Sequence, residues 1–244
     1  MKVGIIADIH SNAPALEAVL NDLSLKNVGQ IVHLGDAFNG PIDPVGVADL
    51  LRERQTIHVQ GNGERMVLSD DSAVRSRSAE YARQRLSVED LAWIRAWPTY
   101  FDSEDIFACH GTPASDTEYL LEDVTMSGVR LRSVGEVRAQ LGSIKASLIL
   151  CAHSHVPRLV ELGGRVSVLN PGSVGLPAYS LDSPIRHTME TGSPHARYAI
   201  AERRGLGWHV EHVAVSYDHM KAAATAEQEG FLDWVAPLKS GYAL

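Results

Sequence analysis

Side chains that can bind a metal ion follow the apolar runs of this sequence. The first case is Asp8-Ile-His10, which comes directly after the run from residue 3 to residue 7. Such a run is typical of a buried strand, and residues two apart on an extended chain point the same way. A carboxylate and an imidazole placed in this way can bind one ion. An isolated Asp-x-His motif is more often a helix-capping aspartate beside a surface histidine.

Four further apolar runs also end in an oxygen or imidazole donor. The donors are Asp36, Asn62, His110 and the pair His153 and His155. Each has an ordinary explanation by itself, as a turn, a cap or a hydrogen-bonded histidine, but independent surface residues have no reason to follow a strand every time. Two metal ions about 3.5–4 Å apart need such a set, with one carboxylate between them. The mixed donors suit Mn, Fe or Zn better than Mg or Ca, and we favour Mn.

Strands alternating with helices must position these donors. Helical spacing begins at Asn12 and Pro14, after the first strand, and returns over residues 45–54, after the second. This alternation favours right-handed βαβ units and a mainly parallel sheet. The donors then lie at the carboxyl ends of the strands, where open α/β sheets bind ligands.

From residue 99 onward, strand patterns outnumber helix patterns. Strand patterns cover residues 99–101, 106–109, 146–152, 156–162, 165–169, 196–201 and 207–215, and Gly163-Gly164 is a strong hairpin signal. Residues 114–143 read as helix and loop, with the best helix over 134–141. Residues 174–195 are rich in Ser, Pro and Gly and predict a long surface loop, a feature that is usually functional or mobile.

Length and composition predict one domain. The 244 residues are 45% hydrophobic, and we find no repeat, linker or low-complexity segment. We therefore expect a single domain over residues 1–244, ending in a helical tail over about residues 216–244. The apolar side chains of that tail, Phe231, Trp234, Val235 and Leu238, would cap the core or mediate homo-oligomerisation.

Charge and cysteine usage narrow the class of partner and the compartment. The net charge of −8 argues against binding of long nucleic acid and against a basic membrane patch. No stretch has the length of a transmembrane helix, and we expect no signal peptide. The two cysteines, Cys109 and Cys151, give no disulfide framework, which favours a reducing cytoplasm.

The ordered motifs resemble those of the calcineurin-like metallophosphoesterases, in their small bacterial and archaeal phosphodiesterase branch. The family motifs D-x-H, G-D, G-N-H-[DE], H-G and G-H-x-H appear in order as Asp8-Ile-His10, Gly35-Asp36, Gly61-Asn-Gly-Glu64, His110-Gly111 and Ala152-His-Ser-His155. The resemblance runs from residue 1 to about residue 173. It implies an α/β (α+β) fold, a four-layer α/β/β/α sandwich of two mixed sheets flanked by helices.

The resemblance also implies two metal ions and their ligands. One ion would be held by Asp8, His10, Asp36 and His155, and the other by Asp36, Asn62, His110 and His153. Asp36 would bridge them, and Asp36, Asn62 and His110 are the expected catalytic residues. A hydroxide bridging the ions would attack the phosphorus of a small phosphate ester. We expect the substrate to be a diester rather than a monoester.

The sequence departs from the family pattern at Gly63, where the motif has a histidine. That histidine would contact the phosphate and could protonate the leaving group, a type of catalysis typically worth about 10²–10⁴-fold. The enzyme would then prefer acidic leaving groups, use a substitute such as His187, His195 or Arg65, or be slow. A solvated loop histidine is the more ordinary interpretation of His195.

A second class of function stays open beside the enzyme. A retromer subunit resembles this family and has become a binding module, so the same fold can serve as a protein-binding scaffold. Loss of metal ligands would mark that route, whereas here every ligand position is filled. A nuclease acting on long DNA is disfavoured by the acidic balance and by the absence of a basic stripe in the sequence.

Overall fold

The computed structural model describes residues 1–243, and strands and helices alternate through much of that range. The strands are β1 (Lys2–Ile6), β2 (Gln30–His33), β3 (Thr56–His58), β4 (Tyr100–Asp102), β5 (Ile106–Cys109), β6 (Glu122–Thr125), β7 (Gly128–Leu131), β8 (Leu148–Leu150), β9 (Arg158–Gly163), β10 (Val166–Asn170), β11 (Ala178–Leu181), β12 (His187–Glu190), β13 (Ala196–Arg204) and β14 (Gly207–Val215). The helices are α1 (Ala13–Leu25), α2 (Pro44–Arg52), α3 (Asn62–Leu68), α4 (Arg77–Arg83), α5 (Val88–Arg95), α6 (Val134–Leu141), α7 (His219–Gln228) and α8 (Leu232–Ser240). Residue 244, the last of the expected tail, lies outside the described residues.

Two mixed five-stranded sheets form the centre of this described part. The first has the order β14-β13-β1-β2-β3, and the second has the order β4-β5-β8-β10-β9. In the first sheet β1, β2 and β3 are parallel, as the βαβ pattern predicts, but β13 runs antiparallel along the free edge of β1. In the second sheet β5, β8 and β10 are parallel between antiparallel edge strands.

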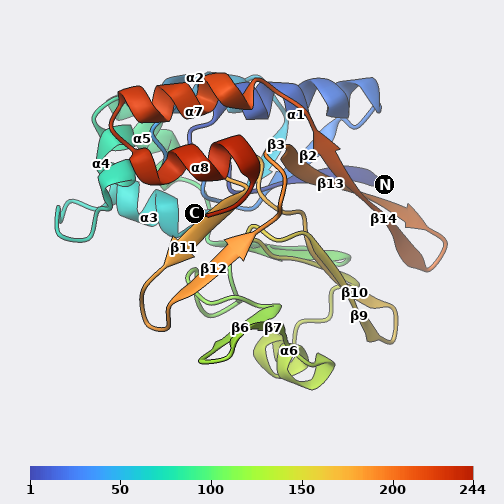
Figure 1. Ribbon diagram of the computed structural model, residues 1–244. Helices are drawn as coiled ribbons and strands as arrows, with labels where there is room; N and C mark the ends of the chain where they lie inside the picture. Colours follow the sequence, from blue (N-terminus) through green and yellow to red (C-terminus); the bar gives the residue numbers. More distant parts are fainter. Residues whose placement is uncertain (244) are drawn as a thin grey trace.

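Alternating side chains of the strands build three apolar layers. Ile6 of β1 belongs to the cluster formed with α1 and α2, whereas its neighbour Ile5 packs between the two sheets. In β5, Ala108 packs between the sheets and Phe107 joins the cluster that contains α6 residues. Figure 1 shows α1 and α2 at the top, α6 at the bottom and the sheets between them. The four-layer α/β/β/α sandwich is therefore confirmed.

Two stretches expected to lack strands contain hairpins. Residues 174–195, expected as a long loop, contain β11 and β12, which pair antiparallel. Residues 114–143, expected as helix and loop, contain the hairpin of β6 and β7 as well as α6. These strands are four residues long, and β7 is exposed over its whole length, so no apolar alternation marks them.

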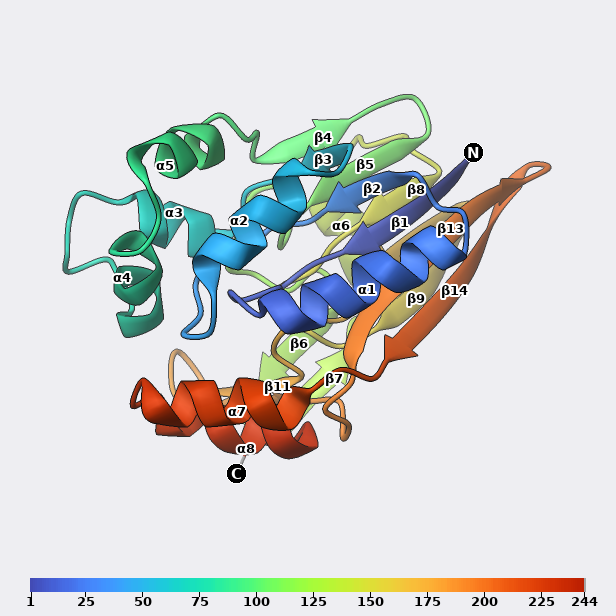
Figure 2. The same cartoon turned by 90° about the horizontal axis from the view of Figure 1, so that it is seen from above.

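The C-terminal helices lie against the body of the chain. Figure 2 shows α7 and α8 packed side by side at the end of the molecule away from the N-terminus, and α1 and α2 over the first sheet. Phe231, Trp234 and Leu238 are buried in a cluster with Ile42 and Leu176. Three of the four apolar tail residues are thus covered within the chain itself, whereas Val235 is half-buried. Among residues 1–243, no helix is long and apolar enough to span a membrane.

Candidate metal centre

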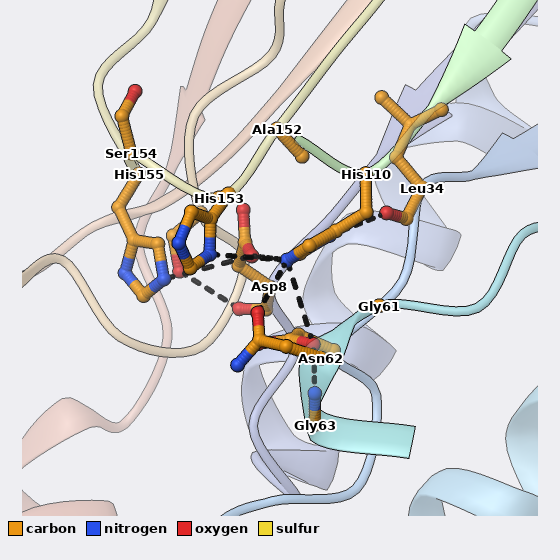
Figure 3. Close-up of polar contacts among 12 residues, drawn as sticks. Asp8, Leu34, Gly61, Asn62, Gly63, His110, Ala152, His153, Ser154 and His155 are labelled. Carbon is orange, nitrogen blue, oxygen red and sulfur yellow. Dashed lines mark hydrogen bonds and ion pairs between the residues drawn. The ribbon is translucent and has the colours of Figure 1, made fainter. Parts of the chain in front are cut away.

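The seven predicted ligands meet at one edge shared by both sheets. Asp8 and His10 follow β1, Asp36 follows β2, and Asn62 begins α3 just after β3. His110 follows β5 of the second sheet, and His153 and His155 follow β8. Figure 3 shows the side chains of Asp8, Asn62, His110 and the two later histidines converging on one point. The structure therefore brings together all the residues that the strand ends predict.

The backbone at these strand ends is bent into an uncommon conformation. The φ angles of Asp8, His10, Asp36, His153 and His155 lie between 50° and 67°. Five of the eight non-glycine residues with positive φ in the described chain are thus predicted ligands. A left-handed conformation costs a non-glycine residue about 1 kcal/mol or more, and such residues cluster at functional sites. The bends aim consecutive side chains at the same point.

The first donor group consists of Asp8, His10 and His155, whose ligand atoms lie within 4.8 Å of one another. His10 Nδ1 donates to the carbonyl of Asn39 at 3.1 Å, and His155 Nδ1 donates to the carbonyl of Leu176 at 2.6 Å. Both Nε2 atoms are therefore unprotonated, and they face each other at 3.1 Å. Two lone pairs so close repel each other unless a cation lies beside them.

The second donor group consists of Asp36, His110 and His153, also within 4.8 Å of one another. His110 Nδ1 donates to the carbonyl of Leu34 at 2.7 Å, which leaves Nε2 directed at the group. That Nε2 lies 3.1 Å from Asn62 Oδ1 and 3.2 Å from His153 Nδ1 (Figure 3). Asn62 thus adds an amide oxygen to this group.

Burial shifts the pKa values of four candidate ligands so that their neutral forms are favoured. Burial raises the pKa of Asp8 well above its ordinary value; this effect outweighs the lowering by His110, and the nearby carboxylate of Asp36 adds to the rise. Burial lowers the pKa of His10, His153 and His155, the value of His153 to about 3, so these imidazoles are neutral as metal ligands must be.

His110 and Asp36 shift each other's pKa values. Burial lowers the pKa of His110, but the carboxylates of Asp36 and Asp8, 3.5 and 4.0 Å from Nε2, outweigh it and the pKa is raised. Burial opposes ionisation of Asp36, yet the imidazoles of His110, His10 and His153 together lower its pKa. Asp36 therefore interacts with histidines of both donor groups.

The residues fit a divalent metal centre. Both carboxylate oxygens of Asp8 are buried and have no hydrogen-bond partner in the structure, although a buried carboxylate normally has one. The donors are carboxylates, an amide and four imidazoles, and the far nitrogens of His10, His110 and His155 are fixed by backbone carbonyls, as is usual for metal-binding histidines. Asp8, His10 and His155 would hold one ion, and Asp36, His110, His153 and Asn62 the other.

Glu64 holds the loops that carry the ligands, a role that the sequence analysis missed. Its buried carboxylate accepts backbone N–H groups of Asp36 and Ala37, both at 2.7 Å, and of Gly61 at 2.8 Å. It thereby ties the end of β2 to the start of α3. Burial raises the pKa of Glu64 to about 7. The sequence feature that could have pointed to this role is the position of Glu64 in the motif Gly61-Asn-Gly-Glu64.

Asn39, also missed, explains the glycine at position 63. A Cβ at Gly63 would lie 2.3 Å from Asn39 Oδ1 and 2.8 Å from Asp36 Oδ1. The Gly63 N–H donates to Asp36 Oδ1 at 2.6 Å, which fixes the close approach. The Asn39 carboxamide therefore occupies the space into which a side chain at position 63 would project. Its Oδ1 is buried without a hydrogen-bond partner in the structure.

Of the three suggested substitutes for the missing histidine, two lie away from the metal centre and the third is held in an ion pair. His187 is in β12, where it contacts the Tyr119 hydroxyl at 2.8 Å, and His195 precedes β13. Two cavities, of about 360 and 390 Å³, lie beside the metal centre, and neither histidine lines them. Arg65 lines the cavity of about 390 Å³ on the His110 side, but its guanidinium is paired with Asp116.

Comparisons with known proteins agree with this geometry. The family model of the calcineurin-like phosphoesterase superfamily domain matches residues 1–192. An uncharacterized protein of Methanocaldococcus jannaschii is 24% identical over 258 residues, which cover 96% of this chain and 95% of that protein.

Solved structures share the fold over the whole chain. A metallophosphoesterase from Sphaerobacter thermophilus is similar with a TM-score of 0.76 and 23% identity, covering 99% of this chain and 100% of that one. A hypothetical protein from Pyrococcus horikoshii gives a TM-score of 0.75 and 18% identity, covering 100% and 99%.

Proposed function

The chain belongs to the calcineurin-like phosphoesterase superfamily, and we propose that it is a dinuclear-metal-dependent phosphoesterase that prefers small phosphodiesters. The observation that carries this proposal is the pair of adjacent donor groups, Asp8, His10, His155 and Asp36, His110, His153. Asp36, whose pKa responds to histidines of both groups, is the residue suited to contact both ions. When bound, two divalent ions lower the pKa of a shared water and neutralise charge on phosphoryl oxygens.

The chain's own residues contribute position and hydrogen bonds. Backbone carbonyls fix the imidazoles of His10, His110 and His155 before any ligand binds. Asn62 and His110 lie side by side at the second group, where their side chains would orient a phosphoryl oxygen. The Asn39 carboxamide lies where a side chain at position 63 would project. It can donate a hydrogen bond but cannot transfer a proton, so we expect a preference for acidic leaving groups.

Charge around the site supports diesters over monoesters. In the described chain, the residues that line the cavity of about 360 Å³ beside both donor groups include no Lys or Arg. A monoester dianion would be bound there by the metal ions alone, whereas a diester carries a single negative charge. Manganese remains the favoured metal because of the mixed donors. A cytoplasmic location and association of copies through the tail also remain predictions.

The test is hydrolysis of bis-p-nitrophenyl phosphate and p-nitrophenyl phosphate by chelator-stripped protein resupplied with Mn²⁺. We expect metal-dependent turnover with a higher kcat/KM for the diester. A higher kcat/KM for the monoester would contradict the diester preference. No turnover of either ester despite bound metal would contradict the enzyme and favour the scaffold.

A further inference from the structure

The cavity of about 360 Å³ beside the donor groups is walled by segments far apart in the sequence. His10, Asp36 and Asn62 line it on the side of the metal centre. Leu176, Tyr179 and Leu181 line it from in and beside β11, and Trp234 lines it from α8. Figure 1 shows α8 lying next to β11. The hairpin and the C-terminal helix therefore form a wall that the metal-ligand motifs alone do not supply.

Two aromatic rings join this wall to the ligand histidines. The Trp234 ring lies edge-on to the His10 ring, with centroids 5.8 Å apart and planes at 74°. The Tyr179 ring lies edge-on to the His155 ring, at 4.6 Å and 65°. Both histidines belong to the first donor group. A molecule bound at that group by its phosphate would have its organic part beside Trp234 and Tyr179.

The polar groups of the cavity select against a second anion. Beside the apolar side chains, the wall away from the metal centre carries the hydroxyls of Ser76, Ser78 and Ser180 and the carboxylate of Asp233. No Lys or Arg is among the lining residues of the described chain. A mostly apolar cavity with a few hydroxyls is typical of a site for a neutral organic group.

We propose that this cavity binds a neutral, planar ring system carried by the phosphodiester, which makes Trp234 and Leu181 residues that determine specificity. The inference rests on the proposed function and adds the substrate class: aryl or nucleobase-bearing diesters rather than alkyl diesters or polyphosphates. Aromatic rings gain from edge-on or offset contacts with Trp and Tyr in addition to burial of their apolar area.

The test compares two stable monoanionic diester mimics, monomethyl phenylphosphonate and monomethyl methylphosphonate. Their dissociation constants are measured by calorimetry on the Mn²⁺-loaded protein, so that no turnover is needed. Burial of a phenyl ring predicts about tenfold tighter binding of the phenyl compound. We expect Trp234→Leu and Leu181→Ala to lower this ratio severalfold. Leu159→Ala in β9 is the matched control, because Leu159 is 43% exposed and Leu181 is 41% exposed.

The binding and hydrolysis results test the ring site and the proposed function separately. Equal affinities for the two compounds in the wild type overturn the inference, as does a ratio unchanged in both variants. The exposed Leu181 keeps the test valid if Trp234→Leu fails to fold. Hydrolysis of bis-p-nitrophenyl phosphate without ring-selective binding overturns this inference alone. Ring-selective binding without any hydrolysis supports the ring site and contradicts the proposed function.

Discussion

At the scale of single residues, the strongest demand for a cation comes from Asp8. Its two oxygens are buried without a hydrogen-bond partner in the structure, and burial raises its pKa well above the ordinary value. An ionised carboxylate in such a place is stable only beside positive charge. The neutral imidazoles of His10 and His155 do not supply it, and His110 lies nearer to Asp36, at 3.5 Å, than to Asp8, at 4.0 Å. We therefore assign this role to a bound metal ion.

Replacing Asp36 tests the bridging assignment. Asp36→Asn removes the carboxylate that histidines of both donor groups surround, so we expect weaker binding of both ions, by roughly a hundredfold or more, and loss of turnover. Metal content after dialysis and hydrolysis of bis-p-nitrophenyl phosphate measure the two effects. Asp49→Asn, an exposed position in α2, is the control. Unchanged metal content and rate in Asp36→Asn would refute the assignment.

Gly63 and Asn39 are coupled by the space between them. Gly63→Ala places a Cβ against the Asn39 amide and should lower the free energy of unfolding by about 1–3 kcal/mol. In an Asn39→Ala background much of the clash is gone, so the same change should cost less. Urea unfolding of the four proteins of this double-mutant cycle measures the difference. Strictly additive effects would show that the two residues do not share this space.

The convergence of the candidate metal ligands could be predicted from the sequence because each follows a recognisable strand pattern. Asn39 could not, because its importance arises from an absent side chain at Gly63, twenty-four positions away in the chain. Glu64 could be seen only as a motif position. Its three backbone hydrogen bonds depend on how two loops approach each other, which no local pattern encodes.

At the scale of elements, the carboxyl ends of parallel strands place the donors, and a partly buried aromatic cluster supports β3. His58 of β3 stacks on Trp97 with ring centroids 4.2 Å apart and lies edge-on to Trp93 at 5.3 Å. Its Nδ1 lies 3.5 Å from that of His33 in the neighbouring β2. This cluster fixes the strand that leads to Asn62.

The His58 cluster predicts a pH dependence of stability. Burial lowers the pKa of His58 from 6.5 to about 4, so the unfolded chain binds the proton more readily between these values. Its contribution to stability is complete above pH 6.5 and is lost as the pH falls through about 4. Near pH 5 the loss is about 2 kcal/mol.

His58→Phe removes the titrating group and keeps a ring to stack on Trp97. Thermal unfolding of the metal-free protein at neutral pH and near pH 5 should show a smaller acid-induced decrease of Tm in the variant than in the wild type. An equal decrease in both proteins would contradict the assignment of this acid sensitivity to His58.

The secondary-structure elements were predictable where apolar runs or caps mark them. Helix α6 begins and ends where the spacing places it, and the hairpin of β9 and β10 forms at Gly163-Gly164. The hairpins β6–β7 and β11–β12 were not predictable, because short strands with exposed faces carry no periodic signal. The second of these hairpins lines the cavity, so the missed element is one that shapes the site.

At the scale of the whole molecule, each donor group combines ligands from both sheets. His155 from the second sheet joins Asp8 and His10 from the first, and His110 and His153 join Asp36. The apolar layer between the sheets must therefore keep its thickness for either ion to bind. This layered packing followed from the family resemblance, since strand patterns alone do not say which sheets face each other.

Enlarging the space between the sheets should disturb both stability and metal binding. Leu150→Ala removes a fully buried side chain of the inter-sheet layer and should lower the free energy of unfolding by about 2–5 kcal/mol. We also expect a lower affinity for Mn²⁺ in calorimetric titration. Leu206→Ala, at a position that is 63% exposed, is the control. A large loss of stability with unchanged Mn²⁺ affinity would show that the site tolerates movement of the sheets.

The most direct test of the proposed dinuclear phosphoesterase activity is a titration of chelator-stripped protein with Mn²⁺ while bis-p-nitrophenyl phosphate hydrolysis is recorded. Two adjacent donor groups predict that two ions bind per chain and that the rate reaches its full value only when both sites are filled. Full activity with one ion bound per chain, or hydrolysis that does not depend on the metal, would contradict it.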